Sequence, residues 1–309
     1  MNKNHPLVSI ALCTYNGERF LEEQLQSLLR QSYTNIEIIV VDDCSTDGTM
    51  VILERYARRY TNLKVYRNNR NLGFTKNFEK ALLLCSGELI AISDQDDVWH
   101  CDKIMSQVES IGENLLIYHN SEFITESGNK LNRKMSDKFN FYRGSNPEPF
   151  LLFNCVSGHS ILLKKDLLCH ALPFPEGLWY DQWLAYTAAT KGSIDFMDVC
   201  LVNYRIHSES SLDILNIKVK KKQSAVDSFE RQLLWLNHCS NFEDKDGRRL
   251  ANRLKTAYQK RADSFISFSY AYLILKHRNL LLYLQKKGSM SKFNYIIKQV
   301  WGLKAKNLL

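Results

Sequence analysis

Short apolar runs alternate with helical stretches along the first 120 residues. The runs are rich in β-branched residues and predict strands at 8–16, 36–43, 63–68 and 88–93. Between and after them, apolar residues recur at helical spacing and predict helices over 18–32, from about 45, over 74–85 and over 101–111. Continuously apolar strands that alternate with amphipathic helices predict a mostly parallel sheet covered on both faces.

The pattern changes twice further along the chain. Between 115 and 215 it is mixed, with strands predicted at 115–124, 150–163 and 193–206 and a helix at 180–192. From 216 onward only helices are predicted, and residues 216–309 carry a net charge of +14 against −6 for residues 1–215. We therefore expect one domain over 1–215 and a basic helical region over 216–309, with different partners.

Composition narrows the class of protein. A chain of 309 residues with 45% apolar residues can bury a core of its own. Its eight cysteines show no CxxC pair, which predicts reduced, buried thiols and a cytoplasmic protein. The first apolar run lacks a signal-peptide cleavage pattern, and the apolar stretches near residue 270 are too short and interrupted to span a bilayer.

Polar residues follow three of the predicted strands. They are Thr14-Tyr15-Asn16, Asp42-Asp43 and the stretch 93–97, which contains Asp94, Asp96 and Asp97. Ligands bind outside the carboxyl ends of parallel strands, so we expect these clusters to meet at one edge of the sheet.

The five carboxylates in these clusters repel one another unless they are solvated or neutralised. A Mg²⁺ or Mn²⁺ ion with oxygen ligands would relieve the repulsion and bind phosphate as well. The alternative is that Asp42 and Asp43 are turn or capping residues and that 94–97 is a solvated loop. Neither GxxxxGK[ST] nor GxGxxG is present, which argues against an ATPase and a dinucleotide-dependent dehydrogenase.

Four motifs carry a family resemblance: VSIALCTYNG, VVDDCSTDGT, NLGFTKNFEKAL and ISDQDDVW. In this order they resemble the nucleotide-sugar half of family-2 glycosyltransferases with the GT-A fold, closely over about 7–120 and more loosely to 210. The resemblance implies an α/β, Rossmann-like sheet with helices on both faces, an acceptor and catalytic half over about 121–215, and a helical region after it.

The resemblance also implies roles for residues at the strand ends. The nucleotide-sugar contacts would be Thr14, Tyr15, Asn16, Asp42, Asp43, Asn71 and Lys76. Asp94-Gln95-Asp96 corresponds to the DXD motif, in which Asp96 ligates Mg²⁺ or Mn²⁺ and Asp94 supports it, while Asp97 orients the sugar. Such a cation stabilises the negative charge of a departing nucleoside diphosphate.

An inverting transfer also needs one carboxylate that accepts the proton of the acceptor hydroxyl. Asp181 is our candidate, because the family places its catalytic Asp at a comparable helix start. The alternative is that Asp181 is a helix N-cap. Many relatives have Glu-Asp where this chain has Tyr180-Asp181.

Further candidates rest on weaker signals. Arg205 and His207, in NYRIH, are placed at the diphosphate, with a surface histidine as the alternative. Large aromatics stack on sugars but are more often core residues. The candidate acceptor contacts are Trp99, Gly158, His159 and Trp179, with Trp183 as a further stacking candidate.

The basic region combines lysines with aromatics. Its features are the run Lys218, Lys220, Lys221 and Lys222 and later helices that mix Tyr, Phe and Trp with Lys. This composition favours an anionic membrane surface. A solvated basic face or an oligomer contact is the alternative, and no pattern typical of nucleic-acid binding accompanies the lysines.

These observations favour an inverting, metal-dependent glycosyltransferase that builds a bacterial surface polysaccharide or a lipid-linked glycan at the inner face of the cytoplasmic membrane. DQDD with YDQW and YRIH looks most like the rhamnosyltransferase branch, so dTDP-rhamnose is the first donor and UDP-hexose or UDP-N-acetylhexosamine the next. A sugar-phosphate nucleotidyltransferase is an alternative, but the first strand lacks its Gly-rich basic loop. A non-catalytic carbohydrate- or membrane-binding module is another, but it predicts eroded acids, and all of them are present.

Overall fold

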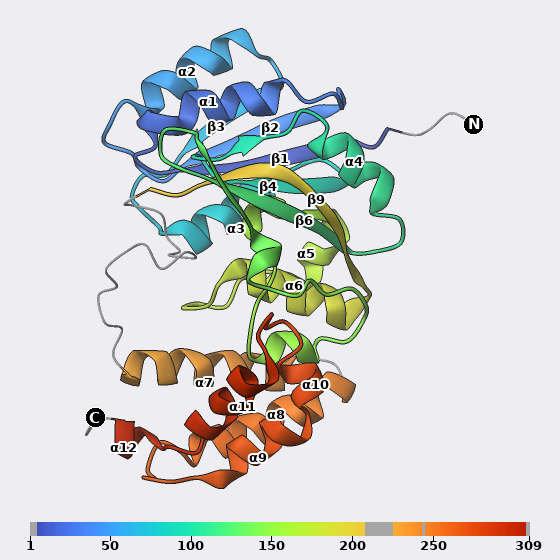
Figure 1. Ribbon diagram of the computed structural model, residues 1–309. Helices are drawn as coiled ribbons and strands as arrows, with labels where there is room; N and C mark the ends of the chain where they lie inside the picture. Colours follow the sequence, from blue (N-terminus) through green and yellow to red (C-terminus); the bar gives the residue numbers. More distant parts are fainter. Residues whose placement is uncertain (1–4, 208–224, 243–244, 307–309) are drawn as a thin grey trace. The chain divides into compact units, whose positions relative to one another are not determined.

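The computed structural model of the protein describes residues 5–207, 225–242 and 245–306 (Figure 1). The chain divides into two separately packed units, the first made of 1–136 and 156–207 and the second of 137–155 and 208–309. Residues 137–155, which we expected in the first domain, thus group with the C-terminal helices. The expected boundary near 215 and the lysine run at 218–222 lie outside the described residues.

The first unit begins with four parallel strands in the order β3-β2-β1-β4. They are β1 (Val8–Thr14), β2 (Ile36–Asp42), β3 (Leu63–Arg67) and β4 (Leu89–Ser93). The crossover helices are α1 (Glu18–Leu29), α2 (Thr49–Arg59) and α3 (Phe74–Leu84). Thr14 pairs with Asp42 and Leu12 with Ser93, so β1, β2 and β4 end at the same edge.

The rest of the sheet is mixed. It contains β5 (Val98–Trp99), β6 (Leu116–Ile124), β7 (Lys130–Lys134), β8 (Leu162–Lys164) and β9 (Ile194–Arg205). Strand β8 runs antiparallel to β4 and β6, whereas β6 and β9 are parallel. The helices are α4 (Lys103–Ser110), α5 (Leu168–Ala171) and α6 (Tyr180–Lys191). The predicted fold class is confirmed, with parallel order limited to β3-β2-β1-β4 and the β6-β9 pair.

The strand predicted at 150–163 was wrong over most of its length. This stretch contains the 3₁₀ helices η2 (Glu148–Leu151) and η3 (Gly158–Ser160), and only its end enters β8. Two further 3₁₀ turns are η1 (Met135–Asp137) and η4 (Lys165–Leu167). Phe150 and Ser160 are buried in i to i+3 turns, so their apolar neighbourhood reflects burial rather than strand pairing.

The core of the first unit follows the strand alternation. Ile10 and Leu12 of β1 point to the same face as Ile38 and Val40 of β2, where Leu25 of α1 covers them. Figure 1 shows α1 and α2 over this face and α3 over the other. Fully burying such a side chain contributes about 1.5–3 kcal/mol, so the strand ends are held by a well-packed core.

The second unit is helical, as predicted. Its helices are α7 (Ala225–Asn241), α8 (Lys245–Gln259), α9 (Phe268–Lys276), α10 (Arg278–Leu281), α11 (Ser289–Lys298) and α12 (Leu303–Lys306). Phe229 of α7 stacks on Tyr258 of α8 at 4.5 Å between ring centroids, and Trp235 donates to the Leu151 carbonyl at 3.1 Å. Among the described residues, no helix is both long and apolar enough to cross a bilayer.

The cysteines match the expectation only in part. The buried thiols are Cys13, Cys85, Cys155 and Cys239, whereas Cys101 and Cys169 are exposed. Burial raises the pKa of Cys85 to about 12, which keeps that thiol protonated and unreactive.

Candidate functional site

The acidic loop 94–97 follows β4 and is fastened to the end of β1. Gln95 accepts the Tyr15 N–H at 2.8 Å and donates to the Tyr15 carbonyl at 3.1 Å. A Cβ at Gly17 would lie 2.2 Å from the Gln95 amide oxygen, so glycine permits this close approach. The structure thus brings the 14–16 and 94–97 clusters to one edge of the sheet.

Asp42 and Asp43 fasten two neighbouring loops to the same edge. Asp42 is fully buried and accepts hydrogen bonds from the Thr14 hydroxyl at 3.0 Å and the Ser45 N–H at 2.9 Å. Asp43 accepts the N–H groups of Leu72 at 2.8 Å and Gly73 at 2.9 Å. These contacts agree with the turn and capping alternative, and a nucleotide contact of Asp43 stays a prediction.

The other predicted nucleotide contacts surround these loops. Tyr15 is 47% exposed, and Asn16 adopts a φ of 48° and accepts the Thr46 N–H at 2.9 Å. Asn71 accepts the Gly73 N–H at 2.9 Å, and the Lys76 ammonium lies 3.1 Å from the Glu79 carboxylate. Asn71 and Lys76 line a cavity of about 580 Å³ with Arg70, Leu72, Glu79, Lys80, Leu83 and Glu176.

Asp97 is the buried member of the acidic loop. One of its oxygens accepts the Arg205 N–H at 3.1 Å, and the other lies 3.6 Å from Nδ1 of His159. Burial, together with the charges of Asp96 and Asp94, raises the pKa of Asp97. Burial and the charge of Lys103 lower the pKa of His159 to about 3, so this imidazole is neutral at pH 7.

Asp96, in the same loop, pairs with His207. Nε2 of His207 lies 2.7 Å from Oδ2 of Asp96, and both side chains are partly or largely buried, at 9% and 20% exposure. Asp94 is partly buried, and this burial, followed by the charges of Asp96 and Asp181, raises its pKa to about 7. The Asp96 carboxylate and the His207 imidazole are ligand types that fit a divalent cation, and in the same loop region the ligand atoms of Asp94, Asp97 and His159 lie within 4.8 Å of one another.

The contact between His207 and Asp96 was not predicted from the sequence. We predicted His207 at the diphosphate. Its ring contacts the carboxylate that we assigned to the metal, and the diphosphate contact stays a prediction. The two residues are 111 positions apart, and no spacing rule in the sequence joins them.

Arg205 stabilises the acidic loop 94–97 through its guanidinium group. Its guanidinium donates to the carbonyl oxygens of Asp96 at 2.8 Å and Glu126 at 2.9 Å and to the carboxylate of Glu23. At 2% exposure it is committed to these partners, so the structure gives Arg205 a supporting position in place of the expected diphosphate contact.

Asp181 occupies the first turn of α6. Trp179 is the N-cap of this helix, so the alternative that Asp181 is the cap is wrong. Burial raises the pKa of Asp181 to about 7, opposed by hydrogen bonds from the N–H groups of Gln182 and Gly158. The charge of Asp181 in turn raises the pKa of Asp94, which places the two carboxylates in one electrostatic site.

Gly158 supports Asp181 in a second way. A Cβ at this position would lie 2.1 Å from the Tyr180 hydroxyl oxygen, so a larger residue would force the Tyr180 side chain to shift. We predicted Gly158 as an acceptor contact, and the structure places it behind the candidate base.

The expected acceptor contacts differ in exposure. His159 is 1% exposed and Trp99 is 4% exposed, so neither side chain offers a surface to an acceptor. Trp183 is also buried and donates to the Ala171 carbonyl at 2.9 Å. Trp179 is partly exposed and lies 5.2 Å from the ring of Phe74, which is itself 47% exposed. Trp179 is therefore the tryptophan best placed to meet a sugar.

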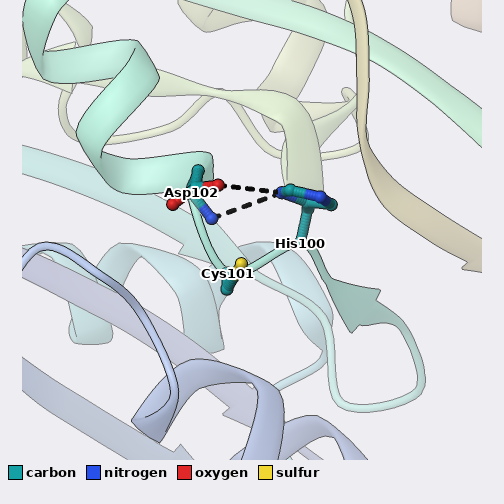
Figure 2. Close-up of side chains that lie close together, drawn as sticks. All are labelled: His100, Cys101 and Asp102. Atoms are coloured by element: carbon teal, nitrogen blue, oxygen red, sulfur yellow. Dashed lines mark hydrogen bonds and ion pairs between the residues drawn. The ribbon is translucent and has the colours of Figure 1, made fainter.

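A second group of possible metal ligands lies at the turn before α4. Figure 2 shows His100, Cys101 and Asp102, whose ligand atoms lie within 4.8 Å of one another. Nδ1 of His100 accepts the Asp102 N–H at 3.3 Å and lies 3.9 Å from the Asp102 carboxylate. These exposed residues are consecutive, so their proximity follows from the turn, and we assign them no function.

The parallel sheet with carboxylates at its strand ends defines an enzyme of the GT-A type. Residues 9–170, more than half of the chain, match the model of Glycosyl transferase family 2, and the protein belongs to this family. An uncharacterized glycosyltransferase of Haemophilus influenzae is 27% identical over 226 residues, which cover 69% of this chain and 70% of that protein. TuaG of Bacillus subtilis, provisionally named a teichuronic acid biosynthesis glycosyltransferase, is 39% identical over 108 residues, which cover 35% of this chain and 43% of TuaG.

Solved structures share the fold. Staphylococcus aureus TarS, crystallised with UDP-GlcNAc, matches with a TM-score of 0.61 and 20% identity over 89% of this chain and 81% of that one. The mannosyltransferase PcManGT of Pyrobaculum calidifontis, in complex with GDP-Man and Mn²⁺, matches with a TM-score of 0.55 and 17% identity over 99% of this chain and 87% of that one. The predicted family and fold are confirmed.

Proposed function

We propose that this enzyme is a metal-dependent, inverting glycosyltransferase that moves a sugar from a nucleotide-sugar donor to a hydroxyl of a polysaccharide or a lipid-linked glycan. The observation that carries the proposal is the Asp96–His207 pair, 2.7 Å apart, whose Asp96 charge also acts on Asp94. Family membership makes sugar transfer the reaction, and this pair offers a place for the cation that such a reaction uses.

Asp96 and His207 would hold the metal, and Asp94 would support it directly or through bound water. When bound, the cation supplies positive charge to the departing nucleoside diphosphate. Imidazole with carboxylate favours Mn²⁺ over Mg²⁺, because Mg²⁺ prefers oxygen ligands alone. The Mn²⁺ in the PcManGT complex supports this choice.

Asp181 would accept the proton of the acceptor hydroxyl as that oxygen bonds to the sugar carbon and the bond to the diphosphate breaks. A pKa of about 7 suits a general base at neutral pH, since about half of the molecules are ionised there. One base and a single displacement invert the configuration at the sugar carbon.

The comparisons bear on donor and acceptor. UDP-GlcNAc in the TarS complex supports UDP-N-acetylhexosamines and UDP-hexoses as the first donors to test, with dTDP-rhamnose beside them. The name of TuaG, which refers to teichuronic acid biosynthesis, supports a polysaccharide as the acceptor.

Thermal unfolding with Mn²⁺ and UDP, dTDP or GDP tests the donor site. A nucleotide at one hundred times its Kd stabilises a protein by about 2.7 kcal/mol, or roughly 5–10 °C for a unit of this size. We expect one nucleotide to give this shift only with Mn²⁺, and we expect Asp96→Asn and His207→Ala to abolish it. His100→Ala, in the second group of ligands, is the matched control and keeps the shift. If every nucleotide leaves Tm unchanged with Mn²⁺, the proposal is wrong.

Asp181→Asn tests the base. The variant should retain the metal-dependent nucleotide shift and lose sugar transfer by about 10²–10⁴-fold. Unchanged turnover would remove Asp181 from the mechanism while leaving the donor site in place.

A further inference from the structure

Exposed apolar side chains gather in one segment of the second unit. Among the described residues, eighteen large apolar side chains are strongly exposed, and eleven of them lie between 265 and 301. We call these eleven the 265–301 surface: Phe265, Ile266, Phe268, Tyr272, Leu275, Leu280, Tyr283, Met290, Phe293, Ile297 and Trp301. Scattered exposed apolar residues are normal, but such a concentration marks an interaction site.

Helix α9 shows that this exposure follows a helix face. Phe268 and Tyr272 are four residues apart and Leu275 follows three residues later, so they lie along one side, at 70%, 60% and 40% exposure. The other side of α9 is packed, with Tyr270 and Ile274 buried. The helix is therefore apolar on the side that packs and on the side that does not.

Helix α11 repeats the arrangement. Met290, Phe293 and Ile297 recur at spacings of three and four and are 73%, 51% and 47% exposed. A solvent-facing helix side normally carries polar residues. The exposed apolar side of α11 therefore indicates a partner that is apolar at least in part.

A short backbone ladder joins the two helices. Ser267 donates to the Val300 carbonyl and Gly302 to the Phe265 carbonyl, both at 2.8 Å, and Ile266 pairs with Trp301. Because α9 begins directly after this ladder and α11 ends just before it, the start of one helix lies beside the end of the other.

The same segment has a one-sided charge. From residue 264 to 309 the sequence contains seven Lys and one Arg and no Asp or Glu. Lys276, Lys286, Lys287 and Lys298 are exposed between and beside the apolar residues. Lysine can bury its aliphatic stem along apolar surface while its ammonium group remains at a charged boundary.

We propose that the 265–301 surface binds the anionic face of a lipid bilayer, with the apolar side chains in the headgroup and upper acyl region and the lysines at the phosphates. Aromatic and aliphatic residues flanked by lysine are the composition of interfacial membrane helices. If a second copy of this chain bound through the same surface, the eight cations of residues 264–309 would face eight identical cations and repel them. A nucleic acid would use the lysines and aromatics but would leave Met290 and Ile297 exposed to water. The proposal goes beyond sugar transfer and does not depend on it.

Vesicle sedimentation of the full chain tests the proposal. We expect binding to phosphatidylcholine vesicles that contain about 30% phosphatidylglycerol, and at least tenfold weaker binding to phosphatidylcholine alone or in 0.5 M salt. An apolar variant, Phe268→Ser with Met290→Ser and Phe293→Ser, and a charge variant, Lys286→Gln with Lys287→Gln and Lys298→Gln, should each weaken binding at least tenfold.

Two controls keep the outcome interpretable. Val51→Ser with Val199→Ser removes exposed apolar residues of the first unit, at 73% and 42% exposure, and should leave vesicle binding unchanged. All variants should retain the circular dichroism spectrum and the nucleotide-dependent Tm shift of the parent, which separates this test from the test of the donor site. Absence of binding by the parent, or equal binding by the surface variants, overturns the proposal. So does a dimer in light scattering that the apolar variant alone dissociates, because it would assign the surface to a second copy.

Discussion

Lys103 and Asp97 are two ionisable groups buried behind the acidic loop, and their coupling can be measured. Both side chains are fully buried, and the Lys103 ammonium lies 3.4 Å from the centroid of the Trp99 ring. Among the described residues, neither Nζ of Lys103 nor Oδ2 of Asp97 has a hydrogen-bond partner. Burial lowers the pKa of Lys103 well below its usual value, and the charge of Asp97 opposes this shift, so an ionised Asp97 favours the ionised form of Lys103.

The magnitude follows from the cost of an uncompensated buried charge. Removing one partner of a buried pair typically costs 3–5 kcal/mol, because the other charge stays buried without it. We expect Lys103→Met to lower the free energy of unfolding by about 3 kcal/mol at pH 7, and Asp97→Asn by a similar amount. The double variant removes both charges, so its loss should fall short of the sum by roughly 1–3 kcal/mol.

Urea unfolding of the four proteins, followed by circular dichroism, measures this coupling. Lys165→Met, an exposed lysine of the same unit, is the control and should stay within about 0.5 kcal/mol of the parent. Additive losses, or a Lys103→Met variant as stable as the parent, would show that the two charges do not compensate each other.

Three further predictions concern the same unit. The rate of sugar transfer should rise about tenfold from pH 6 to pH 8, because a carboxylic acid of pKa about 7, such as Asp181, goes from about one-tenth to about nine-tenths ionised. Initial rates that do not change with pH would contradict the role of Asp181 as the base. Burial raises the pKa of Glu37, but hydrogen bonds from Ser86 and Ser9 outweigh this effect and lower the pKa to about 2. The ionised Glu37 therefore contributes about 3 kcal/mol of stability above pH 4.5, and this contribution should disappear as the pH falls toward 2. Glu37→Gln should flatten that part of an acid-unfolding curve, and an unchanged curve would refute the assignment. Gly158→Ala should lower kcat at least tenfold with little change in nucleotide affinity, because its Cβ would push the Tyr180 ring and disturb the hydrogen bond from the Gly158 N–H to Asp181; parent-like kcat in initial-rate assays would contradict this.

The first half of the fold was predictable because its signals are local. Apolar runs of five to seven residues between amphipathic helices indicate parallel strands, and the structure has β1 to β4 within a few residues of those runs. The strand predicted at 150–163 was wrong because the prediction also used local signals only. A buried apolar segment has the same pattern in the sequence whether it pairs in a sheet or forms 3₁₀ turns. Residues 137–155 could not be placed with the C-terminal helices, because that grouping rests on contacts such as Trp235 with Leu151, far apart in sequence.

The same distinction between local signals and long-range contacts applies to the candidate site. Sequence alone determined the family, the edge where the acidic clusters meet and the basic, acid-free end of the chain, because motif order, strand ends and charge are properties of neighbouring residues. Only the tertiary structure decided that His207 meets Asp96, that Arg205 and His159 support the loop from within, and that Asp97 is the buried acid of the three. The physical reason is that burial and long-range pairing set the protonation and the role of a carboxylate, and both depend on residues that the chain brings together only when it folds.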